Sequence, residues 1–244
     1  NSVPLMCSVF KVINGSEHNI KLPLRVRGCK NSGEFKVRKT MRADTLVILD
    51  FETTGLSPDM GDRAIEIGAV RLENGEVIEE FQELMNPGFK VSGFIEDYTG
   101  ISNAMLKNAD SCENVMGRFA DFLAGDNWVA HNTAFDKRFL DGELKRVQRH
   151  YSGLPSCSLL LSRRIFQDAR SHKLGELVKH ARIHSEGGYH RALYDAQMTA
   201  KIWMAMLEDV GERYGVFDLS FEQIQKLTKT PKKSVDKLLR GWGA

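Results

Sequence analysis

The distribution of apolar residues predicts several strands in the first half of the chain. Residues 45–49 form an almost continuous apolar run, which is typical of a strand buried on both faces. A shorter apolar run covers residues 126–130. Between them, an apolar stretch from Arg63 and a second stretch at residues 76–85 flank Asn74-Gly75. Because Asn-Gly is a favoured two-residue turn, these two stretches predict a β-hairpin.

Helical spacing of apolar residues dominates the rest of the chain. We expect helices at residues 102–107, 111–123, 133–150, 159–166, 173–182 and 191–210. Ser111 and Thr133 are candidate caps for the second and third of these helices. Antiparallel strands followed by strands that alternate with helices predict an α/β fold, with helices on both sides of a mixed sheet.

The C-terminal residues predict a small helical hairpin. Ser220 and Gln223 form a capping-box pattern at the start of a helix that runs through Leu227. Thr230 is the expected cap of a second short helix, with Pro231 at its first position.

Composition excludes some classes of protein and localises the positive charge. The longest apolar runs among the 244 residues are too short to span a membrane, and the scattered cysteines contain no C-x-x-C pair, which favours a reducing, cytoplasmic setting without a secretory signal. Net charge is only +2, but residues 1–44 carry nine Lys/Arg against three Asp/Glu, and residues 219–244 carry six against two. These basic ends favour either anchoring of a polyanion or solubility alone.

Two carboxylates follow the first buried strand. Asp50 and Glu52 project to the same face of an extended chain, whereas Phe51 points to the other face. Two acids at the end of a buried strand repel each other and are costly to remove from water. A divalent cation offsets this cost, and ligands that are all oxygen favour Mg²⁺ or Mn²⁺ over zinc.

Two later segments supply further acids and one histidine. Asp136 lies in the expected first turn of the helix that follows His131-Asn132. His190 follows the glycine-rich residues 187–189, and Asp195 lies in the next helix, close to that loop. A mobile histidine beside an acid favours a role in proton transfer. His131 is instead expected to be structural.

Three motifs together resemble the DEDDh, or DnaQ-like, 3′–5′ exonucleases, which are related to the proofreading subunit of DNA polymerase III. The motifs are DFETTGL at 50–56, AHNTAFD at 130–136 and HRALYDA at 190–196. Two looser segments agree, namely RAIEIGAV at 63–70 and YTGIS at 98–102. The three motifs occur in the family's order and with ordinary spacing, which makes the resemblance specific.

This resemblance, which covers roughly residues 45–208, implies a ribonuclease-H-like fold and catalysis by two Mg²⁺ or Mn²⁺ ions. Asp50 would bridge the two ions, Glu52 and Asp195 would complete the first site, and Asp136 would support the second. His190 would take the proton of the attacking water. The resemblance also implies contacts with the substrate from Thr53, Thr54, Gly55, Leu56, Ile101, Asn132 and Phe135.

The expected organisation has three parts. Residues 1–43 form a basic extension, either a genuine arm or sequence ahead of the native start near Met41; residues 44–212 form the exonuclease domain; residues 213–244 form the basic hairpin. The expected activity is release of nucleoside 5′-monophosphates from a free 3′ end of nucleic acid, with single-stranded DNA preferred and DNA repair as the setting. Two alternatives stay open, an exoribonuclease and a proofreading subunit of a polymerase. A homodimer is also open, and no membrane association is expected.

Overall fold

A six-stranded mixed sheet forms the centre of the structure, in the order β4-β3-β2-β1-β5-β6. Our computed structural model describes residues 42–185 and 190–244. Contacts divide the chain into Asn1–Arg38 and Lys39–Ala244, and the sheet belongs to the second unit. The strands are β1 (Leu46–Thr53), β2 (Ala64–Glu73), β3 (Glu76–Asn86), β4 (Asp110–Ser111), β5 (Trp128–Ala130) and β6 (Pro155–Cys157).

The central strand β1 pairs antiparallel with β2 and parallel with β5. Its residues are almost all buried because helices cover both faces, as the continuous apolar run indicated. The hairpin of β2 and β3 turns at Asn74 and Gly75, which have φ values of 53° and 86°. Positive φ at both positions is the requirement of the turn that Asn-Gly favours.

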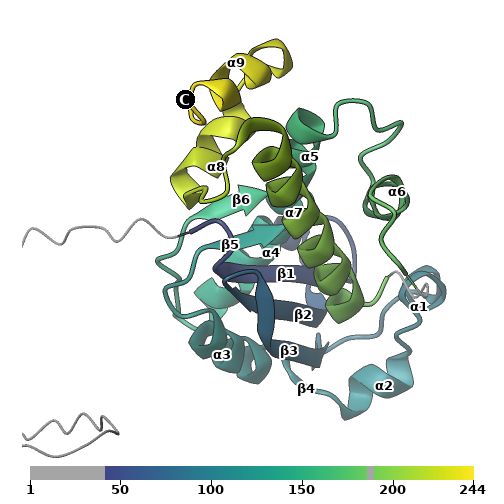
Figure 1. The fold of residues 1–244 in the computed structure, drawn as a ribbon. Coiled ribbons are helices and arrows are strands. Elements are labelled where there is room, and N and C mark those ends of the chain that lie inside the picture. The colour runs from purple at the N-terminus through teal and green to yellow at the C-terminus, as the bar shows by residue number, and fades with distance from the viewer. Residues whose placement is uncertain (1–41, 186–189) are drawn as a thin grey trace, which may run out of the picture. The chain divides into compact units, whose positions relative to one another are not determined.

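Nine α-helices lie in the described part of the chain, with short 3₁₀ turns at η1 (Pro58–Met60) and η2 (Lys232–Ser234). The helices are α1 (Gly93–Thr99), α2 (Asn103–Asn108), α3 (Cys112–Leu123), α4 (Thr133–Arg146), α5 (Ser158–Ile165), α6 (Leu174–His180), α7 (Ala192–Tyr214), α8 (Phe221–Lys229) and α9 (Val235–Arg240). The long helix α7 crosses one face of the sheet (Figure 1).

Alternation along β1 produces two apolar layers. Ile48 packs with Trp203 and other residues of α7, while Val47 and Leu49 pack with α3 and α4 on the opposite face. The predicted α/β fold with helices on both faces of a mixed sheet is therefore confirmed. Its consequence for function is that Asp50 and Glu52 end a strand whose position is fixed by packing on both sides.

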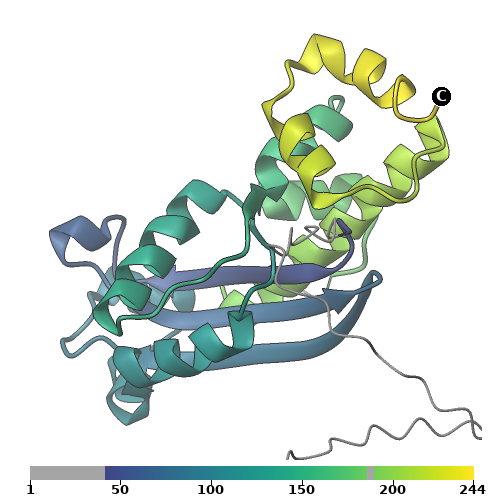
Figure 2. The ribbon, with the colours of Figure 1, turned by 90° about the vertical axis from the view of Figure 1, so that its left-hand side faces the viewer.

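The C-terminal helices belong to the same apolar layer as α7. Phe221, Ile224 and Leu227 are fully or almost fully buried in that layer. Figure 2 shows α8 and α9 beside α7, next to the end of the chain. Residues at the start of the described chain join them, since Ala43 donates its N–H to the carbonyl of Leu219 over 2.8 Å. The indole of Trp203 in turn donates to the carbonyl of Ala43 over 2.7 Å.

The predicted capping patterns have mixed outcomes. The capping box of Ser220 and Gln223 is present, and Ser111 caps α3. The prediction that Thr133 caps α4 is wrong: Asn132 occupies the cap with φ of 78°, and the Thr133 hydroxyl donates instead to the carbonyls of Ala130 and Ser156. Thr230 also fails as a cap, because it ends α8.

Several element bounds differ from the sequence prediction. Helix α4 ends at Arg146 rather than residue 150, and α7 continues to Tyr214. The expected boundary between residues 212 and 213 thus falls inside α7, and the division of the chain into separate functional parts stays a prediction. Residues 1–41 lie outside the described residues. No helix in the described ranges is long and apolar enough to cross a membrane.

Candidate active site

A cleft of about 660 Å³ opens where β1 ends. Three segments bring acids to it: β1 carries Asp50 and Glu52, α4 carries Asp136 and α7 carries Asp195. Its lining is formed by Asp50, Phe51, Glu52, Thr53, Thr54, Gly55, Leu56, Ser92, Phe94, Ile95, Tyr98, Thr99, His131, Phe135, Asp136, His190 and Asp195. The four acids and the histidine predicted from sequence therefore share one cavity.

The acids in this cleft hold protons more tightly than free carboxylic acids do. Burial raises the pKa of Glu52 to about 8, assisted by the negative charges of Asp195 and Glu66. Burial also raises the pKa of Asp136 to about 7. The pKa of Asp50 is raised well above its usual range by burial and then by the charges of its acidic neighbours. Such a cluster is favourable for a cation, because positive charge removes the repulsion.

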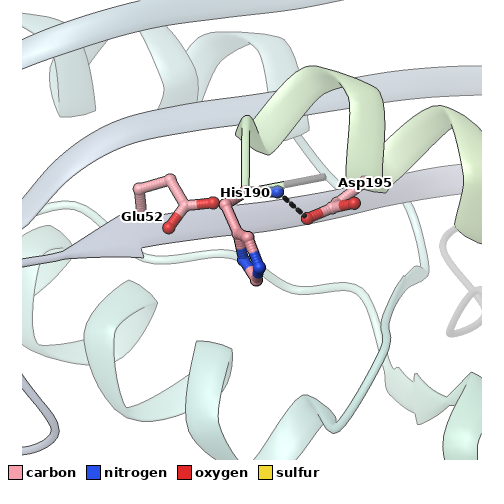
Figure 3. Close-up of side chains that lie close together, drawn as sticks. All are labelled: Glu52, His190 and Asp195. Carbon is pink, nitrogen blue, oxygen red and sulfur yellow. Dashed lines mark hydrogen bonds between the residues drawn. The ribbon is translucent and has the colours of Figure 1, made fainter. Parts of the chain in front are cut away.

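Asp195 is oriented by the loop that precedes α7. The backbone N–H of His190 donates to its Oδ2 over 3.1 Å, as Figure 3 shows. Its other oxygen, Oδ1, is buried and has no hydrogen-bond partner among the described residues. Burial raises the pKa of Asp195 as well. A buried carboxylate oxygen without a partner needs an explanation, and a bound cation would supply one.

The donor set fits a divalent cation. Potential ligand atoms of Glu52, His190 and Asp195 all lie within 4.8 Å of one another. In Figure 3 the Glu52 carboxylate and the His190 imidazole approach each other from β1 and from the residue that precedes α7. Carboxylate oxygens suit Mg²⁺ or Mn²⁺, and the orphaned Oδ1 of Asp195 provides an open position. The residues present therefore fit the expected metal chemistry.

His131 has a structural environment, in line with the expectation from sequence. Its Nδ1 lies 2.8 Å from the Ser158 hydroxyl and its Nε2 lies 2.9 Å from the carbonyl of His172. Burial lowers the pKa of His131 to about 4, so the ring is neutral near pH 7. With both ring nitrogens engaged, this histidine joins β5 to the α5–α6 region.

An ion pair between the partly exposed Arg191 and a buried glutamate fixes the start of α7. Glu66 is completely buried, and its carboxylate accepts from the Arg191 guanidinium at 2.8 Å and from the Ala192 N–H at 3.1 Å. Gly68, two residues further on the same strand face, lets the helix approach, because a Cβ there would lie 2.0 Å from the Leu193 nitrogen. These contacts position the helix that carries Asp195.

The loop after β1 is held by hydrogen bonds of its own. The Thr53 hydroxyl donates to the carbonyl of Gly55 over 2.7 Å, and the Thr54 hydroxyl donates to Asp62 over 3.1 Å. Gly55 lies directly against Asp62, where a Cβ would approach within 2.4 Å of a carboxylate oxygen. Leu56 follows with 75% of its surface exposed. The loop thus presents a free apolar side chain at the rim of the cleft.

Two residues expected at the substrate do not line the cleft. Ile101 is fully buried with Val91, Ile95 and Leu106, so the expectation that it contacts a terminal base is not supported by this arrangement. Asn132 is exposed at the start of α4 and lies outside the lining. Its left-handed backbone turns the chain from β5 into the helix, which explains a conformationally tolerant residue there.

Aromatic residues of α1, and not Ile101, line the active cleft. Phe94 and Tyr98 are 72% and 50% exposed, and their rings stack with centroids 5.8 Å apart. Tyr98 also contacts the His190 ring. Sequence reasoning missed α1 altogether, although the i,i+4 spacing of these two aromatic residues was a signal for a helix with an aromatic face.

Comparisons with known proteins find exonucleases among the similar proteins. The family model described as Exonuclease (RNase_T) matches residues 47–203. The chain is 37% identical over 166 residues to a DNA polymerase III PolC-type of Caldanaerobacter subterraneus subsp. tengcongensis. This alignment covers 68% of this chain and 12% of that protein. It is 39% identical over 174 residues to the 3′-5′ exonuclease DinG of Bacillus subtilis, covering 69% and 18%. The chain thus spans less than a fifth of the length of these curated relatives.

Solved exonuclease structures share the fold of this chain. A structure described as exonuclease X in complex with 5′ overhanging duplex DNA is 26% identical to this chain, with a TM-score of 0.58. The superposed region covers 75% of this chain and 99% of that protein. The nuclease domain of 3′hExo, described as a DEDDh family member bound to rAMP, has a TM-score of 0.59 at 23% identity, which shows a shared fold.

Proposed function

The chain belongs to the RNase_T exonuclease family, and from this we propose that it hydrolyses nucleic acid from the 3′ end and releases nucleoside 5′-monophosphates. The observation that carries the proposal is the meeting of Asp50, Glu52, Asp136, Asp195 and His190 in one cleft. The DEDDh resemblance assigned the same five residues to phosphodiester hydrolysis, and the fold brings them together from three separate segments.

We assign the metal ligands to the four acids. Asp50, Glu52 and Asp195 would hold one divalent cation, and Asp50 with Asp136 would hold a second. When bound, Mg²⁺ or Mn²⁺ would activate the attacking water and neutralise charge on the phosphate. The raised pKa values of these acids and the unpartnered Oδ1 of Asp195 support the assignment, since both describe a site poised for positive charge.

His190 is the proposed general base. Its side chain lies beside Glu52 and Asp195, and its backbone N–H fixes Asp195 (Figure 3). Imidazole accepts protons near neutral pH, which suits removal of a proton from water. The exposed side chain of Leu56 and the ring of Phe135 would hold the terminal nucleotide, with the Thr53–Gly55 backbone close to its sugar.

DNA is the substrate we propose. The relatives at 37% and 39% identity are named as a DNA polymerase and as a 3′-5′ exonuclease, and the complex at 26% identity contains DNA. A 3′-exonuclease structure described as recognising a histone mRNA stem-loop is only 22% identical, so this similarity shows a shared fold and gives no argument for RNA. Work within a polymerase complex, as the PolC match suggests, is the second candidate.

Equal-length DNA and RNA strands test the choice of substrate. Purified protein with Mg²⁺ or Mn²⁺ is expected to shorten a single-stranded DNA faster than the matching RNA. His190→Ala should lower kcat by roughly 10²–10⁴-fold, the usual range for loss of a general base. A faster reaction on RNA would assign the chain to the exoribonuclease alternative. No hydrolysis of either polymer, in a protein that binds metal, would reject the proposed activity.

A further inference from the structure

A second cleft lies beside the active site and is lined mainly by α4. It has a volume of about 620 Å³ and lies between the 3₁₀ turn η1 and the exposed face of α4. Its floor is Gly142, where an added Cβ would lie 3.5 Å from Pro58. The lining residues are Pro58, Asp59, Arg138, Asp141, Gly142, Lys145 and Arg146. We refer to this surface as the α4 cleft.

The α4 cleft carries cations with few internal partners. In the described ranges, neither Arg138 nor Lys145 forms a side-chain ion pair, and both are exposed. Arg146 has only a long contact of 3.8 Å with Glu143, whose carboxylate is already bound by Arg63. Of the two acids in the lining, Asp141 accepts hydrogen bonds from Lys137 and Tyr151. Positive charge therefore remains available.

The α4 cleft continues from the active cleft. Phe135 lines the active cleft, and the guanidinium of Arg138 lies 5.8 Å from the centre of its ring. On the other wall, only Ser57 separates Leu56 of the active cleft from Pro58 of η1. Lys145 lies seven residues beyond Arg138, about 10 Å along the helix and on the same face.

The negative charge of the active cleft gives a basic surface next to it a role in binding a polyanion. The active cleft contains four carboxylates, which repel a polyanion before any cation binds. A strand whose 3′ end enters it needs positive charge outside the catalytic residues. Lys and Arg on a helix face suit phosphates, because they contact the backbone without reading bases.

We propose that the α4 cleft binds the phosphodiester backbone of the substrate strand, on the 5′ side of the bond that is cleaved. This inference rests on the proposed exonuclease function. Arg138 would contact the backbone next to Phe135, and Lys145 and Arg146 would contact phosphates further from the 3′ end. The bland alternative is that these residues form only a solvated helix face.

The test compares Lys145→Gln/Arg146→Gln with the wild-type protein on a dinucleotide and on a single strand of about ten nucleotides, within the range of common single-strand sites. We expect the ratio of kcat/KM for the long strand to that for the dinucleotide to fall roughly tenfold at low salt. The log–log salt slope for the long strand should flatten by about 1.4, since each single-strand phosphate contact contributes about 0.7.

A matched control removes two charges elsewhere. Lys107→Gln/Lys201→Gln alters two exposed lysines, one on α2 and one on α7, and should leave both the ratio and the slope at wild-type values. Lys145→Arg keeps the charge and should behave as wild type, and melting curves exclude loss of fold. An unchanged ratio and slope in the Lys145/Arg146 variant, or an equal effect in the control, would overturn the proposal that the α4 cleft binds the substrate backbone. Absence of hydrolysis by the wild type on every strand would instead reject the proposed function.

Discussion

The ring of Tyr98 lies against the imidazole of His190, with centroids 4.1 Å apart and planes tilted by 40°. The first residue belongs to α1 and the second lies two residues before α7, so the contact joins two segments far apart in sequence. Phe94 also stacks with Tyr98. Among the described residues, the ring of the proposed base is thus held by aromatic contacts, and no hydrogen bond from a third residue reaches it.

Removal of the Tyr98 ring should therefore impair positioning of the base. Tyr98→Ala is expected to lower kcat by up to roughly tenfold, since an aromatic pair contributes about 0.5–1.5 kcal/mol. Tyr98→Phe keeps the ring and should retain wild-type kcat. Rate profiles over pH check this reading: the alanine variant should keep a limb that depends on His190. Equal losses in both variants would mean that the hydroxyl, not the ring, matters.

The raised pKa values predict how metal-free protein responds to pH. Glu52 has an ordinary pKa of 4.5 and a folded-state pKa of about 8, so the folded protein holds this proton more tightly than the unfolded chain. The resulting loss of stability is absent below pH 4.5, grows as pH rises and is complete above pH 8. Asp136 acts in the same direction up to about pH 7.

Melting curves in chelator should accordingly show lower stability at pH 8 than at pH 6, and Mg²⁺ or Mn²⁺ should reduce that difference. Asp50→Asn should raise the melting temperature of the metal-free protein, because it removes one charge from a repelling cluster. A metal-free protein whose melting temperature rises between pH 6 and pH 8 would contradict this account of the acids.

A buried ion pair between α4 and the residue that precedes β2 supports the loop that follows β1. Arg63, at the start of β2, binds Glu143 through two hydrogen bonds of 2.8 and 2.9 Å, and the Glu143 side chain is only 3% exposed. Arg63 also receives the backbone hydrogen bond of Thr54 at its carbonyl. Arg63→Ala leaves the Glu143 charge buried and should destabilise the protein by about 3–5 kcal/mol.

Urea unfolding measures this loss, and Arg63→Met/Glu143→Met serves as the control. Replacement of both charges by apolar side chains should recover most of the stability, because such replacements are often neutral. If the double variant is as unstable as Arg63→Ala, packing rather than an uncompensated charge explains the effect.

The C-terminal helices should be needed for stability. Leu227 is fully buried in the layer beneath α7, so Leu227→Ala should reduce the free energy of unfolding by about 2–5 kcal/mol. The substitution of exposed Lys229 by Ala is the surface control and should have little effect. Deletion of residues 220–244 should then harm hydrolysis of short and long strands alike. A truncated protein of normal stability that is defective only on long strands would restore the idea of a phosphate anchor.

The acids and the histidine that the sequence analysis singled out share one cleft, whereas several details around them differ from the prediction. The four acids could be identified from the sequence because Asp50 and Glu52 lie at the end of a strongly apolar strand, and Asp136 and Asp195 lie in the first turns of two helices with clear patterns. The cap at Thr133 was misassigned because a left-handed residue at Asn132 depends on tertiary contacts, which also direct the Thr133 hydroxyl to β5 and β6. The sequence did not show which of Tyr98 and Ile101 lines the cleft, because both are large side chains of one short segment.

Long-range contacts were also invisible in the sequence. Glu66 lies opposite Glu52 in the register of β1 and β2, yet its carboxylate forms an ion pair with Arg191 at the start of α7, 125 residues later. Its burial follows from the approach of α7 at Gly68, which no local pattern predicts. The two-residue β4 and three-residue β6 were missed because segments so short contain no measurable period.

The direction of cleavage tests the central claim most directly. A single-stranded DNA labelled at its 5′ end is incubated with the protein and Mg²⁺ or Mn²⁺, alongside Asp195→Asn as the inactive control. Exonucleolytic attack at the 3′ end predicts a ladder that shortens one nucleotide at a time, with nucleoside 5′-monophosphates as the released product and no reaction in the variant. Immediate release of labelled mononucleotide, internal cuts, or full activity of Asp195→Asn would contradict the account.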